Sequence, residues 1–263
     1  MNISRLALLL VCVLLGLASC GPVPPPKNPY TEGQSLLDDM ARHREKIRSF
    51  RITGRVDHFG AKHRMQGTVF LFAKLPTSLR IEIVSPFGSP LQVLTVHEGQ
   101  FALHDLREGR FFTGEALPCN IAHLIRIPLP PEDVMKILIG LSPVIDGSRT
   151  VNWDRRGFYN VEITGESGQQ QLHISGDRNR LELIHSRLKR ADGTTAFDLS
   201  FEDWDPIGGG RIPHHIRVKM PRDKADLLLR YDNDGVEINV DLPHDAWIQK
   251  TPSGLRAEIL TCN

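Results

Sequence analysis

Four residues near the N-terminus have the types and spacing that a lipid-attachment reaction needs. Leu17, Ala18 and Ser19 stand directly before Cys20, and an uncharged apolar run from Leu6 to Gly16 comes before them. This pattern resembles the bacterial lipobox, in which small residues fit the peptidase cleft and the cysteine thiol takes a diacylglycerol before cleavage. We therefore expect residues 1–19 to be a signal peptide and Cys20 to be the lipid-attachment residue. The alternative is an ordinary secretory peptide in which Cys20 is incidental.

Lipidation at Cys20 has a consequence for location. Three acyl chains, each contributing about 0.8 kcal/mol per buried CH₂, would anchor the chain permanently in a bilayer. Gly21 stands where enterobacterial lipoproteins that stay in the inner membrane carry an aspartate. We therefore expect an outer-membrane, lipid-anchored protein that faces the periplasm.

The remaining residues that could do chemistry form weaker patterns. Cys119 and Cys262 are the thiols left for a disulfide in a compartment that permits one, although the sequence does not decide whether they pair. His214 and His215 are neighbours in a strand pattern, so they point to opposite faces and do not chelate one metal together. The carboxylates of residues 202–205 precede a glycine-rich turn, which favours a solvated loop over acid–base catalysis. The sequence predicts no enzyme, no cofactor and no metal site.

Composition limits the classes of partner. Lys and Arg total 32 and Asp and Glu total 31, so the formal net charge is +1, and hydrophobic residues make up 40% of the chain. A nearly neutral chain lacks the basic footprint of a nucleic-acid-binding protein. Outside the first twenty positions no apolar run is long enough for a transmembrane helix. These values indicate an ordinary globular domain.

The segments after Cys20 predict a tether and then a helix. Residues 20–31 contain five prolines without apolar periodicity, which predicts an extended spacer that holds the domain on the order of 30 Å from its lipid. Leu36, Leu37 and Met40 then recur at helical spacing within residues 32–48. This predicts an amphipathic helix that packs on the sheet; a helix on the membrane surface is the alternative.

Period-two alternation occupies most of the remaining chain. It predicts an antiparallel meander of six strands between residues 50 and 113, two helices within residues 117–141, and a second meander up to residue 242. We predict a mainly β (α+β) fold: a single strongly curved antiparallel sheet, an unclosed half-barrel, with helices plugging its concave face. The domain would span residues 32–242, and residues 243–263 would form a C-terminal tail.

The hairpin of residues 79–96 is the most informative stretch of the sheet. Pro86 and Gly88 suit a tight turn and hold Phe87 at its tip, where a loop normally faces water. Alternation along the strands predicts that a concave cavity is lined by an odd-numbered apolar set: Val69, Leu71, Leu79, Ile81, Ile83, Leu91 and Val93. A Phe87 folded back over the sheet edge is the alternative to an exposed ring.

Three segments in their order resemble the LolA/LolB-like lipoprotein-localisation family: FRITGRV from Phe50, LRIEIVSPFGSPLQVL from Leu79 and IPLPPEDVMKILIGLSP from Ile127. The resemblance covers about residues 36–241. It implies a hydrophobic acyl-chain cavity under a helical lid, to which Val134, Ile137 and Leu138 would contribute. It also implies that the turn Pro86–Phe87–Gly88 assists insertion into a membrane. The second meander is longer than in the family, and the C-terminal extension and the few aromatic residues on the strands also depart from it.

The resemblance implies a monomer that accepts acylated lipoproteins from a LolA-like periplasmic carrier and inserts them into the outer membrane. The alternative is a structural or sensor lipoprotein of the envelope that uses the same fold to bind a protein or a lipid without transfer. A cavity and an exposed apolar turn serve both, so the sequence leaves the two open.

Overall fold

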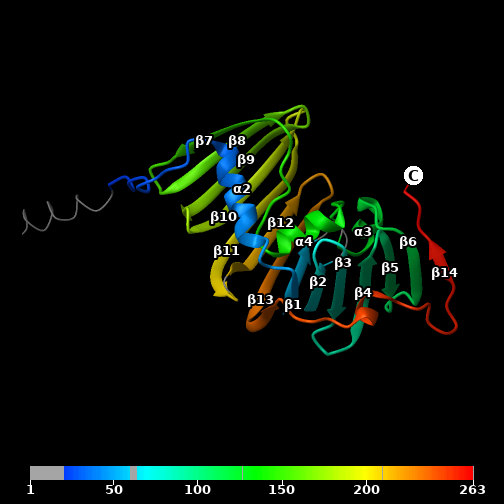
Figure 1. Cartoon of the computed structure of the whole chain (residues 1–263). Coiled ribbons are helices and arrows are strands. Elements are labelled where there is room, and N and C mark those ends of the chain that lie inside the picture. The colour runs from blue at the N-terminus through cyan, green and yellow to red at the C-terminus, as the bar shows by residue number, and fades with distance from the viewer. Residues whose placement is uncertain (1–20, 60–63, 126, 209, 263) are drawn as a thin grey trace, which may run out of the picture.

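A computed structural model describes residues 21–59, 64–125, 127–208 and 210–262 of the chain (Figure 1). The predicted signal peptide with Leu17, Ala18, Ser19 and the lipid-attachment residue Cys20 lies outside the described residues. No helix in the described part of the chain is long and apolar enough to cross a membrane.

The described strands form one 14-stranded sheet. We call β1 to β6 its first half and β7 to β13 its second half. The first half comprises β1 (Ser49–Phe59), β2 (Arg64–Lys74), β3 (Ser78–Val84), β4 (Pro90–His97), β5 (Gln100–Asp105) and β6 (Arg110–Glu115). The second half comprises β7 (Ser148–Trp153), β8 (Phe158–Gly165), β9 (Gly168–Asp177), β10 (Arg180–Arg190), β11 (Thr195–Ile207), β12 (Gly210–Met220) and β13 (Ala225–Ile238).

Each half is an antiparallel meander, and the first strand of the chain joins them by pairing with the last strand of the second half. The order is β14-β6-β5-β4-β3-β2-β1-β13-β12-β11-β10-β9-β8-β7. The sheet is curved and stays open between its edge strands β14 and β7, as predicted. The fold class predicted from the sequence is therefore confirmed.

Strand β13 contains an irregular segment. The sequence Asn233-Asp234-Gly235 is typical of a turn between two strands, but β13 continues through it. The register with β1 shifts there, because Ile52 lies opposite Val236 whereas Gly54 lies opposite Tyr231. The extra residues form a bulge in one strand, since turn-forming residues also suit the irregular backbone of a bulge.

Three helices lie on the concave side of the sheet (Figure 1). The helix α2 (Gly33–Arg44) crosses the second half and contacts β7, β10 and β12, with Leu36, Leu37 and Met40 buried. Helices α3 (Pro118–Ile125) and α4 (Pro131–Leu138) lie over the first half. Pro131 opens α4 and is followed by Glu132 and Asp133, an N-terminus that suits the helix dipole. The predicted helices are thus present, and α2 packs on the sheet.

The C-terminal residues belong to the domain and are not a separate tail, which corrects the predicted boundary at residue 242. A 3-10 helix η1 (His244–Trp247) contacts β3 and β4, and the Arg80 guanidinium donates a hydrogen bond to the Ala246 carbonyl. Because Arg80 alternates with Leu79 and Ile81, this contact is on the sheet face opposite the helices. Trp247 is buried there. Strand β14 (Ala257–Ile259) then pairs parallel with β6.

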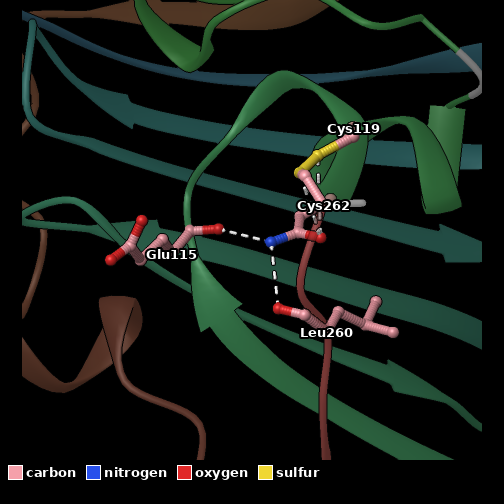
Figure 2. Close-up of a disulfide and its surroundings, with 5 residues drawn as sticks. Glu115, Cys119, Leu260 and Cys262 are labelled. Carbon is pink, nitrogen blue, oxygen red and sulfur yellow. Dashed lines mark hydrogen bonds between the residues drawn. A yellow bond between two sulfur atoms is a disulfide. The ribbon is translucent and has the colours of Figure 1, made fainter.

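A disulfide joins Cys119 of α3 to Cys262, with their Cα atoms 6.1 Å apart (Figure 2). The side-chain amide of Asn120 donates hydrogen bonds to the carbonyls of Glu115 and Leu260 and so ties the same two segments together. The structure thereby settles the pairing that the sequence left open. The disulfide fastens the end of the chain to the beginning of the helical cover.

The N-terminal segment of residues 21–31 is docked on the second half, which corrects the prediction of a free spacer. The Val23 amide donates a hydrogen bond to the Arg155 carbonyl, and the Val23 carbonyl accepts one from Trp153 Nε1, both at 3.0 Å. Tyr30 is buried against Tyr159 and donates a hydrogen bond to Asp39 at 2.6 Å. The proline content predicted extension correctly but gave no sign of the partners that hold the segment.

Candidate acyl-chain cavity and exposed turn

Strands from both halves of the sheet and the helical cover enclose a cavity with entirely apolar walls. Among the predicted wall residues, Val69, Leu71, Ile81 and Ile83 line it from β2 and β3. The predicted lid residues Val134, Ile137 and Leu138 of α4 close it from the other side. The remaining lining residues are Val56, Met65, Ile127, Val218, Leu227 and Leu229. Such a site can hold a hydrocarbon chain but offers no group for catalysis.

The prediction that Leu91 and Val93 line the cavity is wrong. Ile81 lies opposite Leu94, and Leu79 lies opposite Val96, so the concave face of β4 carries even-numbered residues. Val93 shares the opposite face with Glu82, and Leu91 packs half-buried at a bulge beside the turn. The number of residues in the turn changes the parity between the two strands, and a one-residue change reverses every side chain. Leu79 is on the predicted face but does not line the cavity.

The cavity is small in this conformation. Its volume is about 40 Å³. An acyl chain of a lipoprotein is many times larger. Entry of such a chain therefore requires α4 to move away from the sheet.

The C-terminal end of α4 is held by polar contacts in addition to apolar packing. The Tyr231 hydroxyl donates to the Leu138 carbonyl at 3.0 Å, and Arg44 Nε donates to the Ile139 carbonyl at 3.2 Å. Gly140 follows with a φ of 81°, and a Cβ there would lie 2.2 Å from Trp204. Only glycine fits this close approach at low strain. These contacts fix the C-terminal end of the lid to the second half of the sheet.

Arg44 is a buried cation at this junction. It is 3% exposed, and its guanidinium lies 4.9 Å from the centre of the Trp204 ring while Nη2 donates to the Leu181 carbonyl. Burial lowers the pKa of Arg44 to about 10, opposed by the attraction of Glu182. Arg44 stays protonated at neutral pH, so its hydrogen bonds to the lid are charge-assisted and correspondingly strong.

The turn between β3 and β4 presents Phe87 to solvent. The ring is 96% exposed, so the alternative in which it folds back over the sheet edge is wrong. The Gly88 amide donates to the Ser85 carbonyl at 2.9 Å, and Gly88 has a φ of 86°. Pro86 precedes Phe87 at a position that suits its fixed φ. The backbone of the turn therefore holds the ring outward.

The other candidate residues take structural places. His214 is buried beside Tyr231, whereas His215 is partly exposed and lies 3.0 Å from Asp203. The strand alternation thus separates the two imidazoles. Glu202 is exposed on β11. The described part of the chain contains no group of three His, Cys, Asp or Glu residues that could hold a metal ion.

Six of the 13 residues that line the cavity were not predicted, and four of them belong to β1, β12 and β13, of which β1 and β13 pair across a long sequence separation. Val56 of β1 faces Leu229 of β13, and Val218 of β12 lies opposite Leu227. The alternation of each strand identified its apolar face. Nothing in the sequence indicated that β1 pairs with β13, the contact that brings these faces to the cavity.

Comparisons with known proteins identify the type of fold. No family model matches the sequence, and the search of curated proteins found no relative. Among solved structures, a LolA superfamily protein from Nitrosomonas europaea is similar, with a TM-score of 0.56 at 13% identity over 84% of this chain and 99% of that chain.

Two further structures share the arrangement. A DUF1329 family protein from Desulfovibrio piger has a TM-score of 0.57 at 12% identity, over 83% of this chain and 98% of that chain. A putative outer membrane lipoprotein-sorting protein domain from Vibrio parahaemolyticus has a TM-score of 0.50 at 8% identity, over 82% and 97%. At these identities the likeness is one of fold, and the chain has the LolA-like fold.

Proposed function

Because the chain combines a LolA-like fold with an apolar cavity, we propose that it is a periplasm-facing lipoprotein that accepts acylated lipoproteins and inserts them into the outer membrane. Cys20 would carry the anchoring lipid, and a LolA-like periplasmic carrier would deliver the cargo. The domain would act as a monomer. Transfer would follow differences in affinity, so the proposal requires neither catalysis nor a cofactor.

The exposed ring of Phe87 carries this proposal. It stands at the end of the two strands β3 and β4, and β3 supplies Ile81 and Ile83 to the cavity wall. A phenylalanine buries roughly 150–250 Å², so insertion of the ring into a bilayer would gain up to several kcal/mol. Desolvation of the turn backbone reduces that gain. An inserted turn would bring the cavity wall to the membrane, where a released acyl chain can partition.

The small volume of the cavity supports a second candidate function. A volume of about 40 Å³ also suits a scaffold that binds a protein partner or an envelope lipid without taking up a chain. Native mass spectrometry of the purified protein separates the two candidates. Acylated species bound to the domain favour transfer, whereas a consistently empty domain in the presence of carrier and cargo favours the scaffold.

The direct test is Phe87→Glu. The side chain is exposed, so we expect the melting temperature to stay nearly constant while delivery of lipoproteins to the outer membrane is lost. Delivery is measured by fractionation of the two membranes in cells that depend on this protein.

Ile259→Glu is the matched control, because Ile259 is 76% exposed on the edge strand β14, away from the turn. It should leave both stability and delivery unchanged. Normal delivery by a stably folded Phe87→Glu protein would exclude the turn as an insertion element.

A further inference from the structure

The docked N-terminal segment fixes which part of the domain lies nearest to the anchoring lipid. Val23 is held on the turn between β7 and β8, where its amide donates to the Arg155 carbonyl and its carbonyl accepts from Trp153 Nε1. Only Gly21 and Pro22 separate Val23 from Cys20. Three residues span at most about 10 Å, even when fully extended. A lipid on Cys20 therefore brings this turn to within about 10 Å of the bilayer surface.

The neighbouring turn between β9 and β10 lies at the same end of the sheet, because β8 and β9 are antiparallel neighbours. We call these two turns, residues 153–158 and 177–180, the anchor rim. Arg178 of the anchor rim donates to the Asn28 carbonyl and lies over the Tyr30 ring at 4.3 Å. The anchor rim therefore contacts the docked segment at Val23, Asn28 and Tyr30.

The charge of the anchor rim suits an anionic surface. It carries four arginines, at positions 155, 156, 178 and 180, against two aspartates at positions 154 and 177. All four arginines are exposed, as is Lys27 of the docked segment. Arg156, Arg178 and Arg180 form ion pairs with Asp154, Asp39 and Glu182, and each of these guanidinium groups stays at least half open to solvent. Basic residues held within a Debye length of anionic lipids each gain about 1 kcal/mol. The chain as a whole is nearly neutral, so this excess is local.

We propose that the anchor rim docks on an anionic phospholipid surface while residues 21–31 are bound to the domain. The inference rests on the lipidation of Cys20 that is part of the proposed function. The lipid supplies the attachment, and the docked segment together with the arginines supplies the orientation.

This orientation places Phe87 far from the surface that docks on the membrane. β3 ends at the opposite end of the sheet from the anchor rim, as the continuous antiparallel pairing from β8 to β3 requires. A ten-residue strand such as β9 is about 33 Å long. Once detached, the eleven residues 21–31 would reach about 34 Å in extended form. Insertion of Phe87 into the same membrane therefore requires this segment to leave the domain.

The experiment compares the two ends of one strand in the acylated full-length protein. A fluorophore is attached through Asn179→Cys in the anchor rim or through Ser167→Cys in the turn at the other end of β9. The protein is reconstituted into vesicles of phosphatidylethanolamine and phosphatidylglycerol that contain a lipid with a nitroxide on its headgroup. We expect quenching to be several-fold stronger at position 179 than at position 167.

Two variants connect the result to the proposed contacts. The double variant Arg155→Glu, Arg156→Glu should reduce the difference in quenching, as should vesicles of phosphatidylcholine alone, because only the docked segment then supplies the orientation. Tyr30→Ala removes the buried ring that holds the segment, so it should lower quenching at position 179 and raise it for a fluorophore at Ser89→Cys beside Phe87.

Equal quenching at both positions in protein whose acylation is verified by mass spectrometry would overturn the orientation and leave the proposed function standing. Stronger quenching at position 167 would do the same. An unacylated Cys20 would overturn the premise that both proposals share.

Discussion

The two halves of the sheet differ in what fills their concave sides. In the second half, the 12-residue helix α2 lies across the strands and buries Leu36 completely. In the first half, two helices of eight residues each cover the strands, and the cavity lies between α4 and the sheet. Prolines at positions 128 and 130 lie between these helices, and Pro131 opens the second one. The cavity thus lies beneath the part of the cover that is made of short, separately attached pieces, whereas one continuous amphipathic helix covers the second half and packs with Leu36 fully buried.

The largest expected effect is on stability, and it concerns the second half of the sheet under α2. Leu36→Ala removes a side chain that is fully enclosed by α2 and the sheet, so it should lower the free energy of unfolding by about 2–5 kcal/mol. The measurement is equilibrium unfolding in urea. Uptake of a fluorescent fatty acid per folded molecule should not change, since Leu36 does not line the cavity.

Ile137→Ala is the counterpart in the lid. Part of the Ile137 side chain faces the cavity and so has fewer packing partners. Its truncation should therefore lower the free energy of unfolding by about 2 kcal/mol, the lower end of the range for such substitutions. Fatty-acid uptake should rise, because the truncation enlarges the cavity. Equal losses in the free energy of unfolding, together with unchanged fatty-acid uptake in both variants, would show that side chains under α2 and under α4 are packed equally well.

An intermediate effect is expected where the lid is fastened. Tyr231→Phe removes the hydroxyl that donates to the Leu138 carbonyl and should lower the free energy of unfolding by about 1 kcal/mol. Because this bond holds the C-terminal end of α4, fatty-acid uptake should become faster. Stopped-flow fluorescence measures the rate.

Tyr159→Phe is its control, because the Tyr159 hydroxyl accepts a hydrogen bond from the Tyr30 amide and does not touch the lid. It should cost a similar amount of stability without accelerating uptake. Acceleration by both variants would mean that general loosening, and not release of the lid, controls entry.

The smallest effect concerns the docked N-terminal segment. The hydrogen bond from Tyr30, assisted by Arg42 and Arg178, holds the pKa of Asp39 below its usual range. The unfolded value is about 3.9, so the stabilisation is present above that pH and is lost as the pH falls through the lower folded value. Hydrogen exchange of residues 23–31 should therefore become less protected on acidification below pH 4.

Tyr30→Phe should remove this pH dependence, because it deletes the hydrogen bond but keeps the ring. A pH dependence that survives in Tyr30→Phe would assign the effect to another carboxylate. The lid provides the comparison, because the hydrogen bonds from Tyr231 and Arg44 to the lid are accepted by backbone carbonyls.

The sequence predicted local structure well because period-two alternation and helical spacing depend on neighbouring residues. It identified the inward faces of β2 and β3 and the apolar face of α4, and it placed Phe87 at the tip of a turn. It failed where geometry depends on counting or on distant pairing. The apolar run Leu91, Val93, Leu94 and Val96 allows either parity for β4, and only the turn decides between them.

Long-range contacts were also beyond the sequence. The pairing of β1 with β13 joins residues about 180 positions apart and brings Val56, Leu227 and Leu229 into the cavity wall. The docking of Tyr30 on Tyr159 and the cover that Trp247 forms over β3 and β4 are likewise contacts between distant segments. Proline content and a C-terminal extension do not encode such partners.

The disulfide between Cys119 and Cys262 also sets an order for maturation. Its two cysteines are 143 residues apart, and the second is the penultimate residue of the chain. In the export route that the proposed function requires, the N-terminal portion emerges first, so α3 reaches the periplasm before its partner does. The cover of the cavity would then receive its covalent fastening only after the 143 residues from Cys119 to Cys262 have also been translocated. A chain released early would present the cavity with its cover still untied.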